Sequence, residues 1–142
     1  MTQPGLDSAA AATRWRAPQA AKEAAWRGGR NRCPRCGEAV LFARYLKPVA
    51  RCPQCQQDWT LHQADDFPAY LAILISGHIM APAIIAVASR EMLPLWGLMV
   101  LTIGMALGLT LALLQPAKGV VIALQFWWGL HGFEHPARPE MP

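Results

Sequence analysis

The sequence predicts a small β head of the zinc-ribbon type, followed by an all-α transmembrane helical hairpin and an interfacial helix. Hydrophobic residues make up 54% of the 142 residues and charged residues only 15%, which leaves too little polar surface to cover one large soluble domain. Two uncharged runs, at about residues 69–89 and 93–114, are each long enough to cross a membrane. All four cysteines precede these runs, in two C-P-x-C pairs.

Residues 1–30 are rich in alanine and arginine and carry scattered charges. They lack the apolar core of about seven to fifteen residues that a secretory signal contains, and Asp7 and Glu23 disfavour an organelle presequence. We expect a disordered, weakly helical tail over this range. Ten of the 13 lysine and arginine residues precede Asp58, so the chain consists of a basic head on an apolar body.

Residues 31–60 are expected to form the head. The four cysteines in this range are Cys33, Cys36, Cys52 and Cys55. Their pattern, C-x2-C-x15-C-x2-C, is typical of zinc sites. Pro34 and Pro53 preset a tight knuckle in each pair, and Gly37 can supply the left-handed residue that such a turn often needs. Four thiolates at about 2.3 Å close a tetrahedral shell, so we expect one structural zinc per chain and no catalytic metal.

The segment between the cysteine pairs reads GEAVLFARYLKPVAR. Its Val, Phe and Tyr residues predict short strands, with Lys47 and Pro48 forming the turn of a rubredoxin-like or zinc-ribbon module. A module of about 30 residues buries too little to fold alone, so metal binding should supply most of its folding free energy. Three other interpretations of the cysteines stay open: a redox pair, iron in place of zinc, and two disulfides.

Basic residues surround the two knuckles. They are Arg30, Arg32, Arg35, Arg44, Lys47 and Arg51. A basic rim on a zinc ribbon can bind nucleic acid, but beside two membrane spans the attraction of anionic lipid headgroups is an equally physical role. We therefore expect contacts with membrane lipid or with a protein partner, and nucleic acid is the less favoured ligand.

Residues 61–118 are expected to form the two-span hairpin, with spans at about 69–89 and 93–114. The first has 21 residues without a formal charge, enough at about 1.5 Å per residue to cross a hydrocarbon core of roughly 30 Å. Arg44, Lys47 and Arg51 precede the first span and Lys118 follows the second, whereas the connecting loop has only Arg90. The excess of positive charge predicts that both termini are cytoplasmic.

A third apolar stretch, over residues 119–133, is too short to span comfortably. Phe126, Trp127 and Trp128 suit the headgroup region, so we expect an interfacial amphipathic helix on the cytoplasmic face, with a third span as the alternative. Residues 134–142 read as a polar tail.

Several polar residues lie at the start of the first predicted span or within it, where transfer of a polar group into the membrane costs free energy. Asp65 and Asp66 can cap the first span or serve a function at the membrane face. His78 lies near the middle of that span, where ionisable residues are functional candidates by default. It can be a neutral histidine bonded to Thr102 or to a partner subunit, or it can handle haem, copper or protons. Gly104 and Gly108 form a G-x-x-x-G face suited to packing within the hairpin.

The succession of CPRCGEAVLF, LKPVARCPQC, ADDFPAYLAILISGHI and LLQPAKGVVIALQF closely resembles a bacterial inner-membrane family catalogued as domain of unknown function nine-eight-three. The resemblance covers about residues 31–130 and implies that the four cysteines form the metal site. It also marks signature positions of unassigned role: Asp65, Asp66, Pro68, Gly77, His78, Pro116, Lys118 and Gly119. Two residues depart from the family pattern, since Gln56 and Phe67 stand where glycine is usual.

We recognise neither a nucleophile with its base nor a phosphate-binding glycine loop in the sequence, so we do not expect an enzyme. The leading hypothesis is an adaptor, accessory or assembly factor for a larger membrane complex. The resemblance suggests a respiratory haem-copper oxidase, because such proteins look as though they accompany oxidase assembly genes. The alternatives are intramembrane metal or haem handling through His78 and a membrane-tethered nucleic-acid binder. The sequence defines no oligomeric state.

Overall fold

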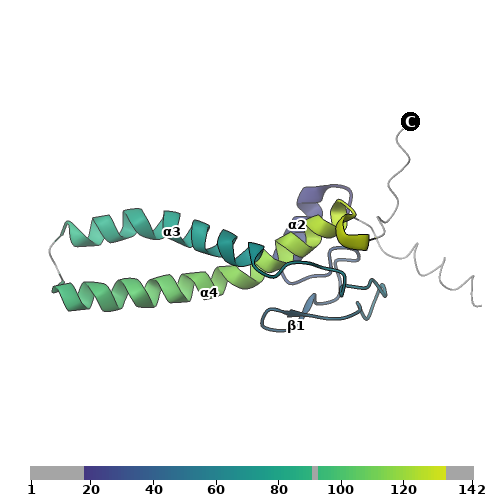
Figure 1. Ribbon diagram of the computed structural model, residues 1–142, viewed down its shortest axis with the longest axis horizontal. Helices are drawn as coiled ribbons and strands as arrows, with labels where there is room; N and C mark the ends of the chain where they lie inside the picture. The colour runs from purple at the N-terminus through teal and green to yellow at the C-terminus, as the bar shows by residue number, and fades with distance from the viewer. Residues whose placement is uncertain (1–17, 91–92, 134–142) are drawn as a thin grey trace, which may run out of the picture.

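The computed structural model describes residues 18–90 and 93–133, and Figure 1 shows an elongated molecule with a helical hairpin at one end and a head at the other. The elements in chain order are α2 (Ala21–Gly29), β1 (Phe42–Arg44), β2 (Lys47–Pro48), α3 (Phe67–Ala88), α4 (Leu95–Trp127) and the 3-10 helix η1 (Leu130–Gly132). The tails expected over 1–17 and 134–142 lie outside the described residues.

Helices α3 and α4 form the predicted hairpin, and both are long and apolar enough to cross a membrane. Ala72, Ser76 and Met80, four residues apart, are the buried stripe of α3 that faces α4. Within this apolar interface the Ser76 Oγ and Thr110 Oγ1 atoms are 3.2 Å apart, so a hydroxyl pair links the two helices. The prediction of two long apolar helices in a hairpin is therefore confirmed.

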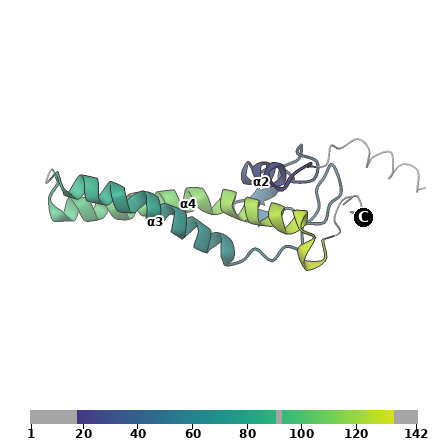
Figure 2. The same cartoon turned by 90° about the horizontal axis from the view of Figure 1, so that it is seen from above.

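Helix α4 is longer than expected. It contains 33 residues, about 50 Å at the α-helical rise, and continues through Pro116. The predicted separate helix over 119–133 is thus mostly the last part of α4, which ends at Trp127. The physical reason is that Val121, Ile122 and Phe126 are buried in a core that they share with the head. Figure 2 shows α2 lying beside this last part of α4 from above. Of the three aromatic residues that suggested contact with lipid headgroups, Phe126 is instead covered by the protein itself, whereas Trp127 is half-buried and Trp128 is exposed.

The prediction of a disordered tail is wrong for residues 21–29, which form helix α2 against α4. The two helices cross at Gly28 of α2 and Gly119 of α4. Their backbones are so close there that a methyl group added at either glycine would overlap the backbone of the other. The absence of both side chains lets the backbones approach closely. Gly119, a signature position without an assigned role, is therefore where α2 docks.

The head shares one hydrophobic core with the end of α4. Trp59, which follows the second cysteine pair, is fully buried and meets the ring of Phe126 at 5.3 Å and that of Phe133 at 5.8 Å between centroids. Leu41 and Phe42 belong to the same buried cluster as the cysteines and Ile122. We expected metal binding to supply most of the folding free energy of a head that folds alone. Burial of apolar side chains against α4 is a second source of stability for this head.

The turn of the β-hairpin lies two residues earlier in the chain than predicted. Lys47 and Pro48 are strand β2, paired antiparallel with β1, and the turn is at Tyr45 and Leu46. Leu46 takes the left-handed conformation that the turn needs (φ 61°). The Tyr45 hydroxyl donates to the Leu111 carbonyl at 2.6 Å, so the hairpin tip rests on α4 near the end of the predicted second span.

Candidate metal centre

The two cysteine pairs form two knuckles of the same geometry. In each one, the residue after the second cysteine donates its N–H to the carbonyl of the first: Gly37 to Cys33 at 2.8 Å, and Gln56 to Cys52 at 3.0 Å. Both donors have left-handed backbone, with φ of 73° at Gly37 and 58° at Gln56. The left-handed glycine predicted at the first knuckle is confirmed, and the second knuckle forms the same turn without a glycine.

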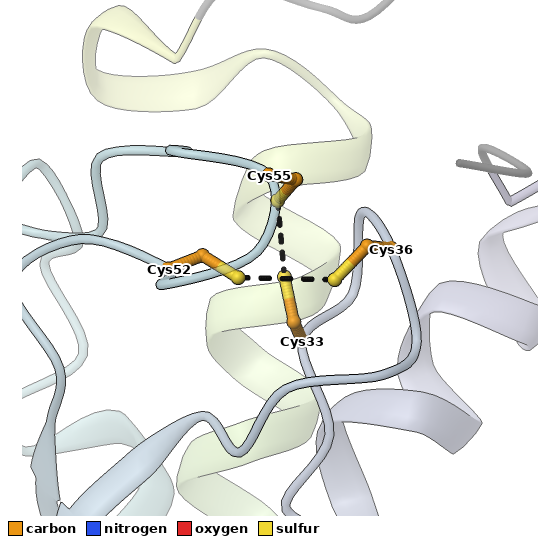
Figure 3. Close-up of side chains that lie close together, drawn as sticks. All are labelled: Cys33, Cys36, Cys52 and Cys55. Carbon is orange, nitrogen blue, oxygen red and sulfur yellow. Dashed lines mark hydrogen bonds between the residues drawn. The ribbon is translucent and has the colours of Figure 1, made fainter. Parts of the chain in front are cut away.

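The knuckles bring all four thiol groups to one point. The Sγ atoms of Cys33, Cys36, Cys52 and Cys55 lie within 4.8 Å of one another, and Figure 3 shows them converging from the two loops. The Cys33–Cys55 and Cys36–Cys52 sulfur distances are both 3.7 Å. A tetrahedral metal with sulfur ligands at about 2.3 Å requires sulfur separations of about 3.8 Å. The donor set and its spacing therefore fit a single four-coordinate metal ion.

The cysteines are free thiols in the structure, since a disulfide would hold two sulfurs at about 2.0 Å. Backbone N–H groups point at three of the sulfurs: Cys36 at Cys33, Gln54 and Cys55 at Cys52, and Gln57 at Cys55. Such donors stabilise thiolate charge. This is the local geometry that a C-x2-C knuckle offers to a bound cation.

The thiols also influence one another electrostatically. A hydrogen bond to Cys55, followed by burial, raises the pKa of the Cys33 thiol, and the same bond lowers the pKa of Cys55 to about 5. Burial raises the pKa of Cys52. The hydrogen bond thus favours negative charge on Cys55, and a divalent cation must displace protons from the neighbouring thiols.

Helix α2 holds the first knuckle through Arg27, a residue that the sequence did not single out. Its guanidinium donates to the carbonyls of Pro34 (3.4 Å) and Arg35 (3.2 Å) and forms a 2.6 Å ion pair with Glu23. The Glu-to-Arg spacing of four residues in an alanine-rich segment was the available signal for a helix. Trp59 was also missed, and its place directly after a knuckle was the only signal for it.

Part of the basic rim is bonded within the head. Arg32 donates to the Gly37 carbonyl at 3.4 Å, and Arg35 donates to Gln57 Oε1 at 3.3 Å. Arg51 lies 4.0 Å from the carboxylate of Asp58. These three cations support the knuckles, so the rim is in part structural.

The aspartate pair lies exposed at the start of α3. Asp66 is the N-cap residue but forms no side-chain cap hydrogen bond, and its carbonyl accepts instead from the N–H groups of Ala69 and Tyr70. Of the two roles that the sequence left open for the pair, a side-chain cap is thus not formed by Asp66. A functional role for Asp65 and Asp66 stays a prediction.

His78 faces away from the hairpin interface. It is exposed, and two residues from Ser76 correspond to about 200° around the helix, nearly the opposite side. Its Nδ1 lies 2.7 Å from the Leu74 carbonyl, which can only accept, so Nδ1 carries a proton and, in the neutral ring, Nε2 is an acceptor. The expected bond to Thr102 is not formed, because the Thr102 hydroxyl donates to Met99. Lys118 is half-buried on α4 beside Gly119.

The glycine face predicted to pack within the hairpin is not used there. A Cβ added at Gly77, Gly104 or Gly108 would meet no atom of the described residues within 4 Å. That prediction is wrong, because the interface forms through Ala72, Ser76 and Met80 instead.

The fold and the site define a class of protein in which a four-cysteine metal-binding head is fixed to the end of a long apolar helical hairpin. A family profile described as Protein of unknown function (DUF983) matches residues 42–126, more than half of the chain, so the chain belongs to that family. The match begins after the first cysteine pair and includes the second pair and both long helices. No curated protein and no solved structure matched the chain.

Proposed function

We propose that the protein is a non-enzymatic adaptor of the bacterial inner membrane, in which a structural zinc fixes a cytoplasmic head to a two-span hairpin. The observation that carries this proposal is the closed geometry of the cysteine cluster. Four converging sulfurs, three of them on buried residues, leave a tetrahedral metal without an open position for water or substrate. The metal then maintains the shape of a head whose core continues into α4, and the exposed surface performs the function.

Membrane insertion is supported by the outer surface of the hairpin. Large apolar side chains such as Ile73, Ile85, Val100 and Leu107 are more than half exposed. Side chains of this kind along two complete helices suit a lipid environment, in which both helices satisfy their backbone hydrogen bonds internally. The cytoplasmic placement of the head follows from Arg44, Lys47 and Arg51 before the first span and Lys118 after the second.

The adaptor role is supported by polar groups that lie outside the hairpin interface. The Nε2 acceptor of His78 lies in the middle of α3 on the face away from α4, where lipid offers no donor. Pro82 has no N–H for the His78 carbonyl, so a second acceptor lies at the same level. A partner helix with a hydroxyl or N–H donor would satisfy both. We expect that partner in a larger membrane complex, with a respiratory haem-copper oxidase or its assembly machinery suggested by the family resemblance.

The experiment is co-purification of the tagged full chain, gently solubilised from native membranes, with partners identified by mass spectrometry. Oxidase subunits are the expected partners, and His78→Leu should reduce their recovery. Ile73→Ala, which alters an exposed residue about 140° around the same helix from His78, is the matched control. Migration of the wild-type protein alone, at its own mass, would contradict the adaptor role.

A second candidate is metal or haem handling through His78. One observation favours it: ligating histidines usually donate the other ring N–H to a backbone carbonyl, as Nδ1 does here to Leu74. Against it, Met80, whose thioether could have been a second soft-metal ligand on this helix, is buried on the α4 side of α3 and cannot share a site with His78. A metal content of one zinc per chain, with no haem absorbance and no change in His78→Ala, would remove this candidate.

A further inference from the structure

A groove of about 450 Å³ lies between α2 and α4, outside the metal centre. Its lining residues are Lys22, Ala25, Trp26, Gly29, Arg30, Pro116 and Val120. The α2 members recur at three- and four-residue intervals and thus share one face of that helix, and Pro116 and Val120 are likewise one turn apart on α4. The volume is within the range of about 300–1,000 Å³ that ligand sites occupy.

The groove is apolar inside and positively charged at its edge. Among the residues that the structure describes, Lys22 and Arg30 are the only charged ones that line it, one near each end of α2, and none that lines it is acidic. The nearest acidic residue of α2, Glu23, is bonded to Arg27. The Arg30 guanidinium lies over the Trp26 ring at 4.1 Å from its centroid, and Trp26 is itself exposed. This arrangement suits a ligand that combines an anionic group with an apolar part.

The position of the groove along α4 indicates where that ligand comes from. Pro116 and Val120 follow the end of the apolar run at Leu114 by two and six residues, about 3 and 9 Å along the helix axis. The headgroup layer of a bilayer is roughly 5–8 Å thick on each side. The groove therefore begins within the headgroup layer, at Pro116, and reaches its outer surface at Val120 once α4 spans the membrane. An apolar groove with two cations at this level fits a membrane lipid better than a free phosphate ion, because a phosphate ion would leave the apolar side chains of the groove exposed to water.

We propose that this groove binds an anionic phospholipid, with the phosphate between Lys22 and Arg30 and the start of an acyl chain against Ala25, Pro116 and Val120. The site rests on the membrane placement of the hairpin but not on any partner complex. Gly29 keeps the groove open, because a Cβ at this position would already lie 3.2 Å from Val120 Cγ2. A bound lipid would fix α2, and through it the first cysteine knuckle, against the membrane surface.

The test is native mass spectrometry of the full chain in detergent, titrated separately with phosphatidylglycerol and phosphatidylcholine. The wild-type protein should retain phosphatidylglycerol preferentially. The pair Lys22→Gln and Arg30→Gln should weaken that binding about 25-fold, since each cation near a membrane surface contributes about fivefold. The matched pair Arg44→Gln and Lys47→Gln removes the same charge from exposed sites on the β-hairpin and should leave binding within about twofold.

A second variant tests the shape of the groove without changing its charge. Ala25→Leu fills the space beside Trp26 and should weaken retention of phosphatidylglycerol while metal content and helicity stay at wild-type values. Equal retention of the two lipids, equal losses in both charge-removed pairs, or undiminished binding in Ala25→Leu would each overturn the proposal. These measurements need no partner protein, so they can fail while the adaptor role stands, and the reverse is also true.

Discussion

Replacing Gln56 with glycine should strengthen metal binding. Gln56 takes φ 58° at the position where the first knuckle has Gly37 at φ 73°. Left-handed backbone costs a residue with a Cβ about 1–2 kcal/mol, whereas glycine adopts it freely but adds roughly 0.5–1 kcal/mol of entropy to the unfolded chain. The exposed bond from Gln56 Nε2 to the Pro53 carbonyl, 3.3 Å, contributes little. We therefore expect Gln56→Gly to stabilise the folded head by about 0.5–1 kcal/mol, equivalent to a two- to fivefold gain in apparent metal affinity.

The assay is competition between the purified full chain and a chromophoric chelator, read as the chelator concentration that removes half of the metal. The control is Gln54→Gly in the same knuckle, which has no positive φ to relieve and should weaken binding slightly. Gly37→Ala should weaken it more, because its Cβ would be strained at φ 73° and would lie 3.2 Å from Arg27 Nε. If Gln56→Gly and Gln54→Gly shift the midpoint in the same direction, the strain argument is refuted.

Three further predictions concern the head and its attachment to α4. Gly119→Leu should detach α2 from α4, because no side chain fits against Gly28, and protease cleavage near α2 should become faster while both spans stay inserted. Phe126→Ala should cost about 3–5 kcal/mol by leaving a cavity beside the buried Trp59, measured as a red shift of tryptophan emission and earlier thermal loss of metal. Acidification should release the metal: the raised pKa values of Cys33 and Cys52 mean that protons compete for these sulfurs, so apparent affinity should fall about tenfold per displaced proton for each pH unit lowered. An affinity that stays constant between pH 8 and pH 6 would contradict this last expectation.

The cysteine cluster and the two long apolar helices were predictable from sequence because each depends on local patterns. A C-P-x-C pair specifies its own knuckle through the proline, the backbone N–H groups and the left-handed residue that follows, so spacing alone indicated the ligand set. Uncharged runs of sufficient length specify helices because a bilayer admits few alternatives. These features require no knowledge of what packs against them.

The remaining features depend on tertiary packing. Helix α2 has low intrinsic stability in isolation and is held by the contact between Gly28 and Gly119, which joins residues far apart in the chain. The continuity of α4 through Pro116 likewise depends on burial of Ile122 and Phe126 beneath the head. From composition, residues 21–29 were expected to be part of a tail and residues 119–133 to be a helix on the membrane surface. In the structure, α2 and the last part of α4 pack against each other.

The central claim is that four cysteine thiolates hold one metal ion in a closed shell that fixes the head to α4. X-ray absorption spectroscopy of the purified full chain, combined with elemental analysis, tests it most directly. We predict one zinc per chain, surrounded by four sulfur atoms at about 2.3 Å. A nitrogen or oxygen ligand in the shell, an open coordination position, or a chain that folds with its cysteines oxidised and no metal would contradict it.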